Sequence, residues 1–132
     1  DRDTHPTYKK ALERLEELKP NNVFFAANTV PSFEYWLLLH FTYTTAPYAA
    51  VGGKSSGAAV LAALKSHWPD YAKASAGAFS YLLHLENDEL GHAKANARRA
   101  LFEAKKNHTD NPSTHVHELV DYLQAIKSSP QK

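Results

Sequence analysis

The chain has 132 residues, which is the length of one ordinary domain and enough to bury a core without disulfide bonds. Its 15 lysines and arginines nearly balance 14 aspartates and glutamates, leaving a formal charge of +1, so no general attraction to nucleic acid or to an anionic membrane is expected. The absence of cysteine excludes disulfide frameworks, cysteine zinc sites and thiol nucleophiles.

Two further features concern the compartment and the ends of the chain. The longest apolar run, residues 35–39, is much shorter than the roughly 20 residues that span a bilayer, and the N-terminus has no signal-peptide pattern. We therefore expect a cytoplasmic protein with no membrane partner. Because the chain starts at Asp1 and contains no methionine, we also expect it to be part of a longer protein.

The first predicted element is an amphipathic helix over residues 6–18. Apolar side chains recur there at helical spacing, Thr4 or Thr7 is placed to cap the start, and Pro20 prevents continuation. Residues 23–27 follow as a short apolar run rich in strand formers. This run predicts a strand buried on both faces, as in a parallel sheet.

The next segment, "PSFEYWLLLHF" at residues 31–41, predicts a buried helix. Ser32 is a natural N-cap, and the segment is apolar on nearly all sides. Residues 42–56 show no period and contain Pro47 and paired glycines, which predicts a long surface loop.

Four more helices are predicted in the rest of the chain. They cover residues 58–68, 71–85, 87–106 and 113–127. The last two have the clearest apolar stripes, and small residues in the stripe of 87–106 permit close packing. The expected fold class is therefore mostly α with a small α/β remnant.

Three acids are candidate metal ligands. Asp1 and Asp3 place two carboxylates near one point, which suits a hard cation such as Mg²⁺ or Mn²⁺, although acids at a chain end are commonly just solvated. Glu34 stands in the first turn of a helix, where the unpaired backbone N–H groups and the helix dipole favour a carboxylate. Capping therefore explains Glu34 as well as a metal does.

Histidines offer two weaker metal sites. Glu89 and His92 have the Glu-x-x-His spacing of carboxylate-bridged di-iron bundles, but the chain has one copy and a solvated helix face explains it better. His108, His115 and His117 cluster near a turn, yet the last two are two residues apart and fall on different helix faces.

A group of cations provides a candidate nucleic-acid surface. Its members lie on the predicted helix 87–106 and are Lys94, Arg98, Arg99, Lys105 and Lys106. Tyr71 and Lys73 could join them. Acids nearby make an ordinary charged helix face the main alternative. No glycine-rich phosphate loop and no Gly-x-Ser-x-Gly elbow occurs, so nucleotide hydrolysis is not expected.

Three segments together resemble a known family. They are "DRDTHP" at the start, "FAANTVPSFEYWLLLHF" at residues 25–41 and "NPSTHVHELVDYL" at residues 111–123. They resemble the RloB-like family, which includes the AbiLii abortive-infection protein and occurs in bacterial phage-defence and restriction-linked operons. The central motif of that family is similar to Ser-Asn-Pro-x-Phe-Glu-x-Trp-Leu-Leu-Leu-His-Phe, and Thr29 and Val30 stand here in place of its Ser-Asn pair.

The resemblance implies a Toprim-like, metal-dependent nuclease acting on nucleic acid. Residues 1–30 would be the C-terminal part of a Toprim-like α/β core, ending its parallel sheet, and residues 31–132 a bundle of four to five helices packed on it. Asp1, Asp3 and Glu34 would be catalytic and would hold Mg²⁺ or Mn²⁺ for phosphodiester chemistry. The expected nucleic-acid-binding residues are Lys73, Lys94, Arg98 and Arg99.

The N-terminal part of the family, with its Glu-Gly motif, does not occur in this sequence. That part would supply another acid and further core strands, so we expect it as a partner segment of the same protein and expect the isolated chain to be inactive. The alternative is a non-catalytic helical interaction module that docks on a partner ATPase of the defence operon.

Overall fold

The computed structural model describes residues 1–19 and 25–128, which form six helices and two short strands. In chain order these are α1 (Tyr8–Leu18), β1 (Thr29–Val30), α2 (Glu34–Leu38), α3 (Ser56–His67), α4 (Ala78–Leu83), α5 (Glu89–Lys106), β2 (Ser113–Thr114) and α6 (Val116–Ser128). The mostly helical fold with a small remnant of sheet confirms the predicted fold class. In the described part of the chain no helix has both the length and the apolar character needed to cross a membrane.

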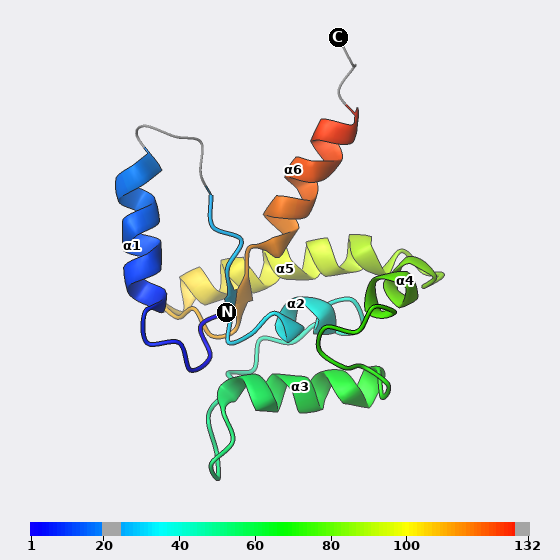
Figure 1. The fold of residues 1–132 in the computed structure, drawn as a ribbon, viewed down its shortest axis with the longest axis horizontal. Helices are drawn as coiled ribbons and strands as arrows, with labels where there is room; N and C mark the ends of the chain where they lie inside the picture. Colours follow the sequence, from blue (N-terminus) through cyan, green and yellow to red (C-terminus); the bar gives the residue numbers. More distant parts are fainter. Residues whose placement is uncertain (20–24, 129–132) are drawn as a thin grey trace.

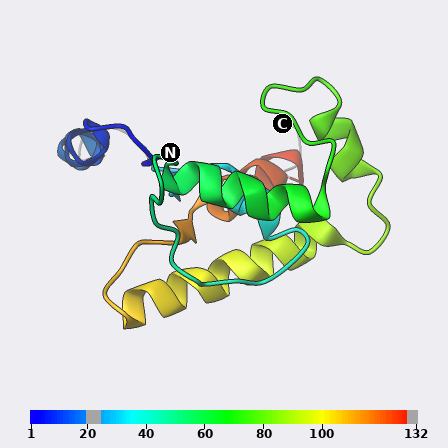
Figure 2. The ribbon, with the colours of Figure 1, turned by 90° about the horizontal axis from the view of Figure 1, so that it is seen from below.

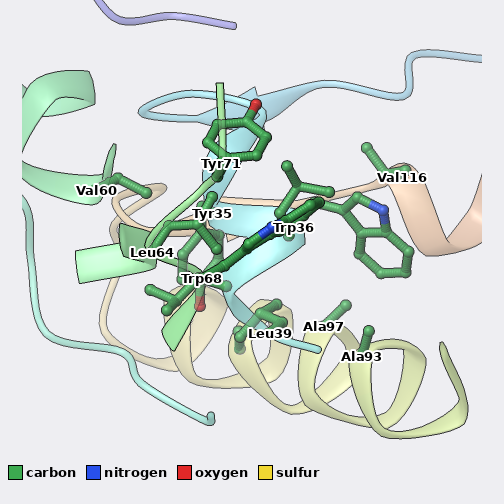
Figure 3. Close-up of a cluster of buried hydrophobic side chains, with 13 residues drawn as sticks. Tyr35, Trp36, Leu39, Val60, Leu64, Trp68, Tyr71, Ala93, Ala97 and Val116 are labelled. Atoms are coloured by element: carbon green, nitrogen blue, oxygen red, sulfur yellow. The ribbon is translucent and has the colours of Figure 1, made fainter. Parts of the chain in front are cut away.

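The core is built around α2, which lies between α3 and α5 (Figures 1 and 2). Because this segment is apolar on almost every side, it can bury side chains against both neighbours, and Leu38 and Leu39 are almost completely buried. On α5 the buried residues include Ala93 and Ala97, and Figure 3 shows Leu39 lying against the turn that carries them. The predicted interior helix is confirmed, and its α-helical part is the five residues of α2.

An aromatic cluster closes the end of α3. The ring of Trp68 stacks on Tyr81 of α4 with centroids 4.3 Å apart, and it contacts Tyr71 at 5.0 Å. These contacts hold the loop between α3 and α4 against the core, with Trp68 and Tyr71 both buried (Figure 3). The loop thereby brings Tyr71 close to the start of α2.

The sheet differs from the predicted one. β1 pairs with β2 in antiparallel register, Thr29 opposite Thr114 and Val30 opposite Ser113, so the expected parallel arrangement is wrong for this pair. Of the predicted strand at 23–27, residues 23 and 24 lie outside the described residues, and 25–27 form no strand. The hydroxyl groups of Thr29 and Thr114 lie 2.8 Å apart, so these two β-branched residues also pair through their side chains.

The first residues of the chain run beside β1. The N–H group of Arg2 donates to the carbonyl oxygens of Thr29 and Pro31, at 3.3 and 3.1 Å, and that of Asp3 donates to Pro31 at 2.8 Å. The backbone that carries the candidate acids is therefore held next to the segment that leads into α2.

Two helices project from this core. α1 and α6 both extend away from the layers formed by α2, α3 and α5 (Figure 1). α1 has no buried residue, and in α6 only Val116 and His117, at its start, are buried. The predicted apolar stripes exist on both helices, but the described residues leave them partly uncovered, with Leu123 and Ile126 exposed.

The remaining helix predictions agree with the structure except in one loop and at the start of the last helix. The predicted helices at 6–18, 58–68, 87–106 and 113–127 correspond to α1, α3, α5 and α6, but α6 begins only at Val116, because Ser113 and Thr114 form β2. The predicted helix at 71–85 is wrong over residues 71–77, and only α4 forms. Ala74 in this loop has φ of 58°, a left-handed conformation that no α-helix accommodates.

Candidate functional site

Glu34 is a buried carboxylate at the first position of α2. Glu34 is 3% exposed, and the two oxygens of its carboxylate have separate partners. Ser32 Oγ donates to Oε2 at 2.8 Å, while the Tyr71 hydroxyl donates to Oε1 at 3.1 Å and Lys73 Nζ lies 3.5 Å from the same oxygen. A buried acid is costly unless it is hydrogen-bonded and paired with a cation, and these neighbours meet both needs.

These contacts change the interpretation of Glu34. No side-chain hydrogen bond caps the start of α2, and the groups that satisfy Glu34 are side chains from residues 32, 71 and 73. Glu34 does stand in the first turn of α2, where the helix dipole favours a carboxylate, but its hydrogen bonds are to side chains. Burial, followed by the nearby Glu34 charge, raises the pKa of Tyr71 to about 12, so its hydroxyl keeps the proton that it donates.

Asp3, the second candidate acid, lies against the start of α3. Its carboxylate accepts hydrogen bonds from the Gly57 N–H at 3.0 Å and from the hydroxyls of Ser55 and Ser56 at 3.2 and 3.4 Å. A carboxylate is stabilised there by unpaired N–H groups and by the helix dipole. Asp3 thus acts as a cap supplied from a distant part of the chain.

The structure does not bring the three candidate acids to one point. Asp1 is exposed, Asp3 is directed to α3, and Glu34 is directed to Tyr71 and Lys73. Across residues 1–19 and 25–128 no group of three or more histidines, aspartates or glutamates could hold a metal ion. In this arrangement the residues do not fit a divalent cation, and their role as ligands stays a prediction.

The weaker histidine candidates are also separated. Glu89 accepts a hydrogen bond from the Asn87 N–H at 3.0 Å, and His92 is exposed. His115 Nδ1 lies 3.1 Å from Glu118 Oε2. His117 is buried, and its Nδ1 is the one buried side-chain nitrogen or oxygen without a hydrogen-bond partner among the described residues.

The four predicted nucleic-acid-binding residues lie in two places. Lys73 is beside Glu34, whereas the others lie on α5. Lys94 and Arg98 both pair with Asp121 of α6, at 2.6 and 2.8 Å, and these contacts lower the pKa of that carboxyl, the hydrogen bond from Lys94 most strongly. The guanidinium carbon of Arg99 lies 3.9 Å from the ring centroid of Tyr43.

An apolar hollow of about 510 Å³ opens beside Tyr71, the hydrogen-bond partner of Glu34. It is lined from α2, α4, α5, α6 and the loop that carries Tyr71, and its lining includes the exposed side chains of Phe79 and Leu83. His40 also lines it and is itself buried, which lowers the pKa of its imidazole. No pattern in the sequence predicted this hollow; of its lining residues, only Tyr71 had been named as a candidate for binding, beside the cations of α5.

Comparison with known proteins gives one match. The model of a family described as "RloB-like protein" matches residues 1–123. No curated protein and no solved structure matches the chain. The match covers both the acid-bearing start and α5.

Proposed function

Since the chain belongs to the RloB-like family, we propose that it is a component of a bacterial phage-defence system and acts on nucleic acid as part of a Mg²⁺-dependent nuclease. Family membership supports the coarser role, in phage defence or restriction. The nuclease activity and the cation are the finer part of the proposal, and they follow from the resemblance of the acid-bearing segments.

One observation carries the assignment of the acids. Backbone hydrogen bonds from Arg2 and Asp3 to Thr29 and Pro31 keep the Asp-x-Asp segment beside the residues that precede Glu34. Such an adjacency is needed if acids from the two segments share a cation. Sharing one also requires Asp3 to leave the N-terminus of α3, and Glu34 to exchange Tyr71 and Lys73 for the metal.

Titration calorimetry with Mg²⁺ and with Mn²⁺ tests the ligand set. We expect Asp3→Asn and Glu34→Gln each to weaken binding by at least about tenfold, because ligand loss costs no less than loss of a supporting hydrogen bond. Asp70→Asn, an exposed acid on the loop after α3, is the matched control and should bind as the wild type does. Equal affinity of wild type and both site variants would contradict the assignment.

A second candidate function rests on the apolar hollow. Phe79 and Leu83 are 71% and 65% exposed at its edge, more apolar surface than a six-residue helix needs for its own packing. This favours the alternative of a helical interaction module that docks on a partner ATPase of the defence system. Its signature is a complex with that ATPase that survives chelation of divalent cations and is lost in Leu83→Lys.

A further inference from the structure

The outward face of α5 surrounds an exposed phenylalanine with cations. Phe102 is 67% exposed, Arg98 and Arg99 lie one turn before it, and Lys105 and Lys106 lie one turn after it. One helical turn is about 5 Å along the axis, so positive charge flanks the ring closely on both sides. The opposite face carries the buried alanines, so this phenylalanine is not part of the core.

The charge of this face is local. The whole chain has a formal charge of +1, yet four cations gather around one ring, with Glu103 as the acid among them on the helix. Among the described residues Asp121 partly neutralises Arg98, while no ion pair is found for Lys105 or Lys106. Glu118 of α6 also lies at this face, so its attraction for anions is centred on Lys105 and Lys106.

Open space lies on both sides of the ring. One hollow, of about 390 Å³, is lined by Phe102, Arg98, Lys105 and the buried His117, and on the α6 side by the acids Glu118 and Asp121. The other, of about 370 Å³, is lined by Phe102, Arg98, Arg99 and Tyr43. Arg99 is held over the Tyr43 ring and Arg98 is held by Asp121, so two of the cations are already ordered before a ligand arrives.

We propose that this face of α5 binds single-stranded nucleic acid, with a base stacked on Phe102 and the neighbouring phosphates held by Arg98 and Lys105. This rests on the proposed function in so far as nucleic acid is the substrate. Aromatic rings interleaved with cations bind single strands because every unpaired base offers a flat face and every linkage a charge. A duplex hides its base faces, so it would gain from the cations but not from the ring.

Fluorescence anisotropy with a labelled thymidine oligonucleotide of about 12 nucleotides, within the usual range of site sizes, tests the inference on the full 132-residue chain. The buffer contains EDTA and little salt. We expect Phe102→Ala to weaken binding by roughly fivefold to a hundredfold, the range that loss of one stacking contact gives, and Phe102→Tyr to restore it. Phe25→Ala removes an exposed ring from the segment before β1, which belongs to no proposed site, and should change nothing.

A charge variant separates stacking from attraction. Lys105→Gln should weaken binding and reduce its salt dependence by about one phosphate contact, whereas Lys65→Gln, at the end of α3, should not. Unchanged affinity in Phe102→Ala, tighter binding of a duplex of the same length, or binding of polyglutamate without binding of the oligonucleotide would overturn the inference. Because the assay contains no free divalent cation, failure of the ligand assignment of Asp3 and Glu34 does not affect its outcome.

Discussion

The carboxylate of Glu34 depends on a hydroxyl that comes from a distant loop. Tyr71→Phe leaves Oε1 with Lys73, whose side chain is 62% exposed and lies 3.5 Å away. A hydrogen bond to a buried charge contributes roughly 1.5–3 kcal/mol, and we expect the free energy of unfolding to fall by about 1.5 kcal/mol, measured by urea denaturation. Tyr122→Phe removes an exposed hydroxyl on α6 and serves as the control; equal losses in the two variants would contradict this role for Tyr71.

At the scale of single residues, the sequence identified the unusual acids but not their partners. Glu34 stands out because it is an acid inside an apolar segment, yet Tyr71 is 37 positions away and reaches it only through the fold of the loop after α3. Asp3 likewise meets Gly57, 54 positions away, so its capping role has no local signal. Patterns along the chain report neighbours at helical or strand spacing, and these contacts are neither.

At the scale of elements, α3 begins with a cap that belongs to another segment. Asp3→Ala removes the acceptor of the Gly57 N–H and a negative charge at the positive end of the helix, while Ser55 still caps Ala58. We expect the free energy of unfolding to fall by about 1 kcal/mol, as for loss of an N-cap, in the presence of EDTA. Asp1→Ala, two residues away and exposed, is the matched control. Equal stability of the two variants in thermal unfolding would show that Asp3 does not cap α3.

Elements with a long apolar stripe were predictable, and the short ones were not. α1, α5 and α6 each repeat one local pattern over at least three turns, so their own residues decide them. β1 and β2 have two residues each and exist because segments 85 positions apart pair through Thr29 and Thr114. Residues 25–27 matched a strand in composition but form none, because composition does not provide a partner strand.

At the scale of the whole molecule, the layering of α3, α2 and α5 could be anticipated only in part. The apolar character of residues 31–41 required an interior position, and the alanine row of α5 allowed a close neighbour. Nothing local determined that α3 would take the other side, or that α1 and α6 would project from the core with part of their apolar stripes exposed. These uncovered stripes distinguish the fold from an ordinary bundle, in which every amphipathic helix buries its apolar face.

Two buried histidines link the stability of the whole molecule to pH. Burial lowers the pKa of His40 and of His117 below the ordinary 6.5, so both take up a proton less readily in the folded protein than in the unfolded chain. The stability that these two neutral imidazoles give the folded protein is therefore fully present above about pH 6.5. It is lost as the pH falls from there towards their lowered pKa in the folded state. We expect the free energy of unfolding to decrease between about pH 7 and pH 5, and to decrease less in His40→Gln, in urea titrations at fixed ionic strength. The exposed His108→Gln is the control and should follow the wild-type curve; a wild-type curve as shallow as that of His40→Gln would show that this imidazole is not held neutral by the core.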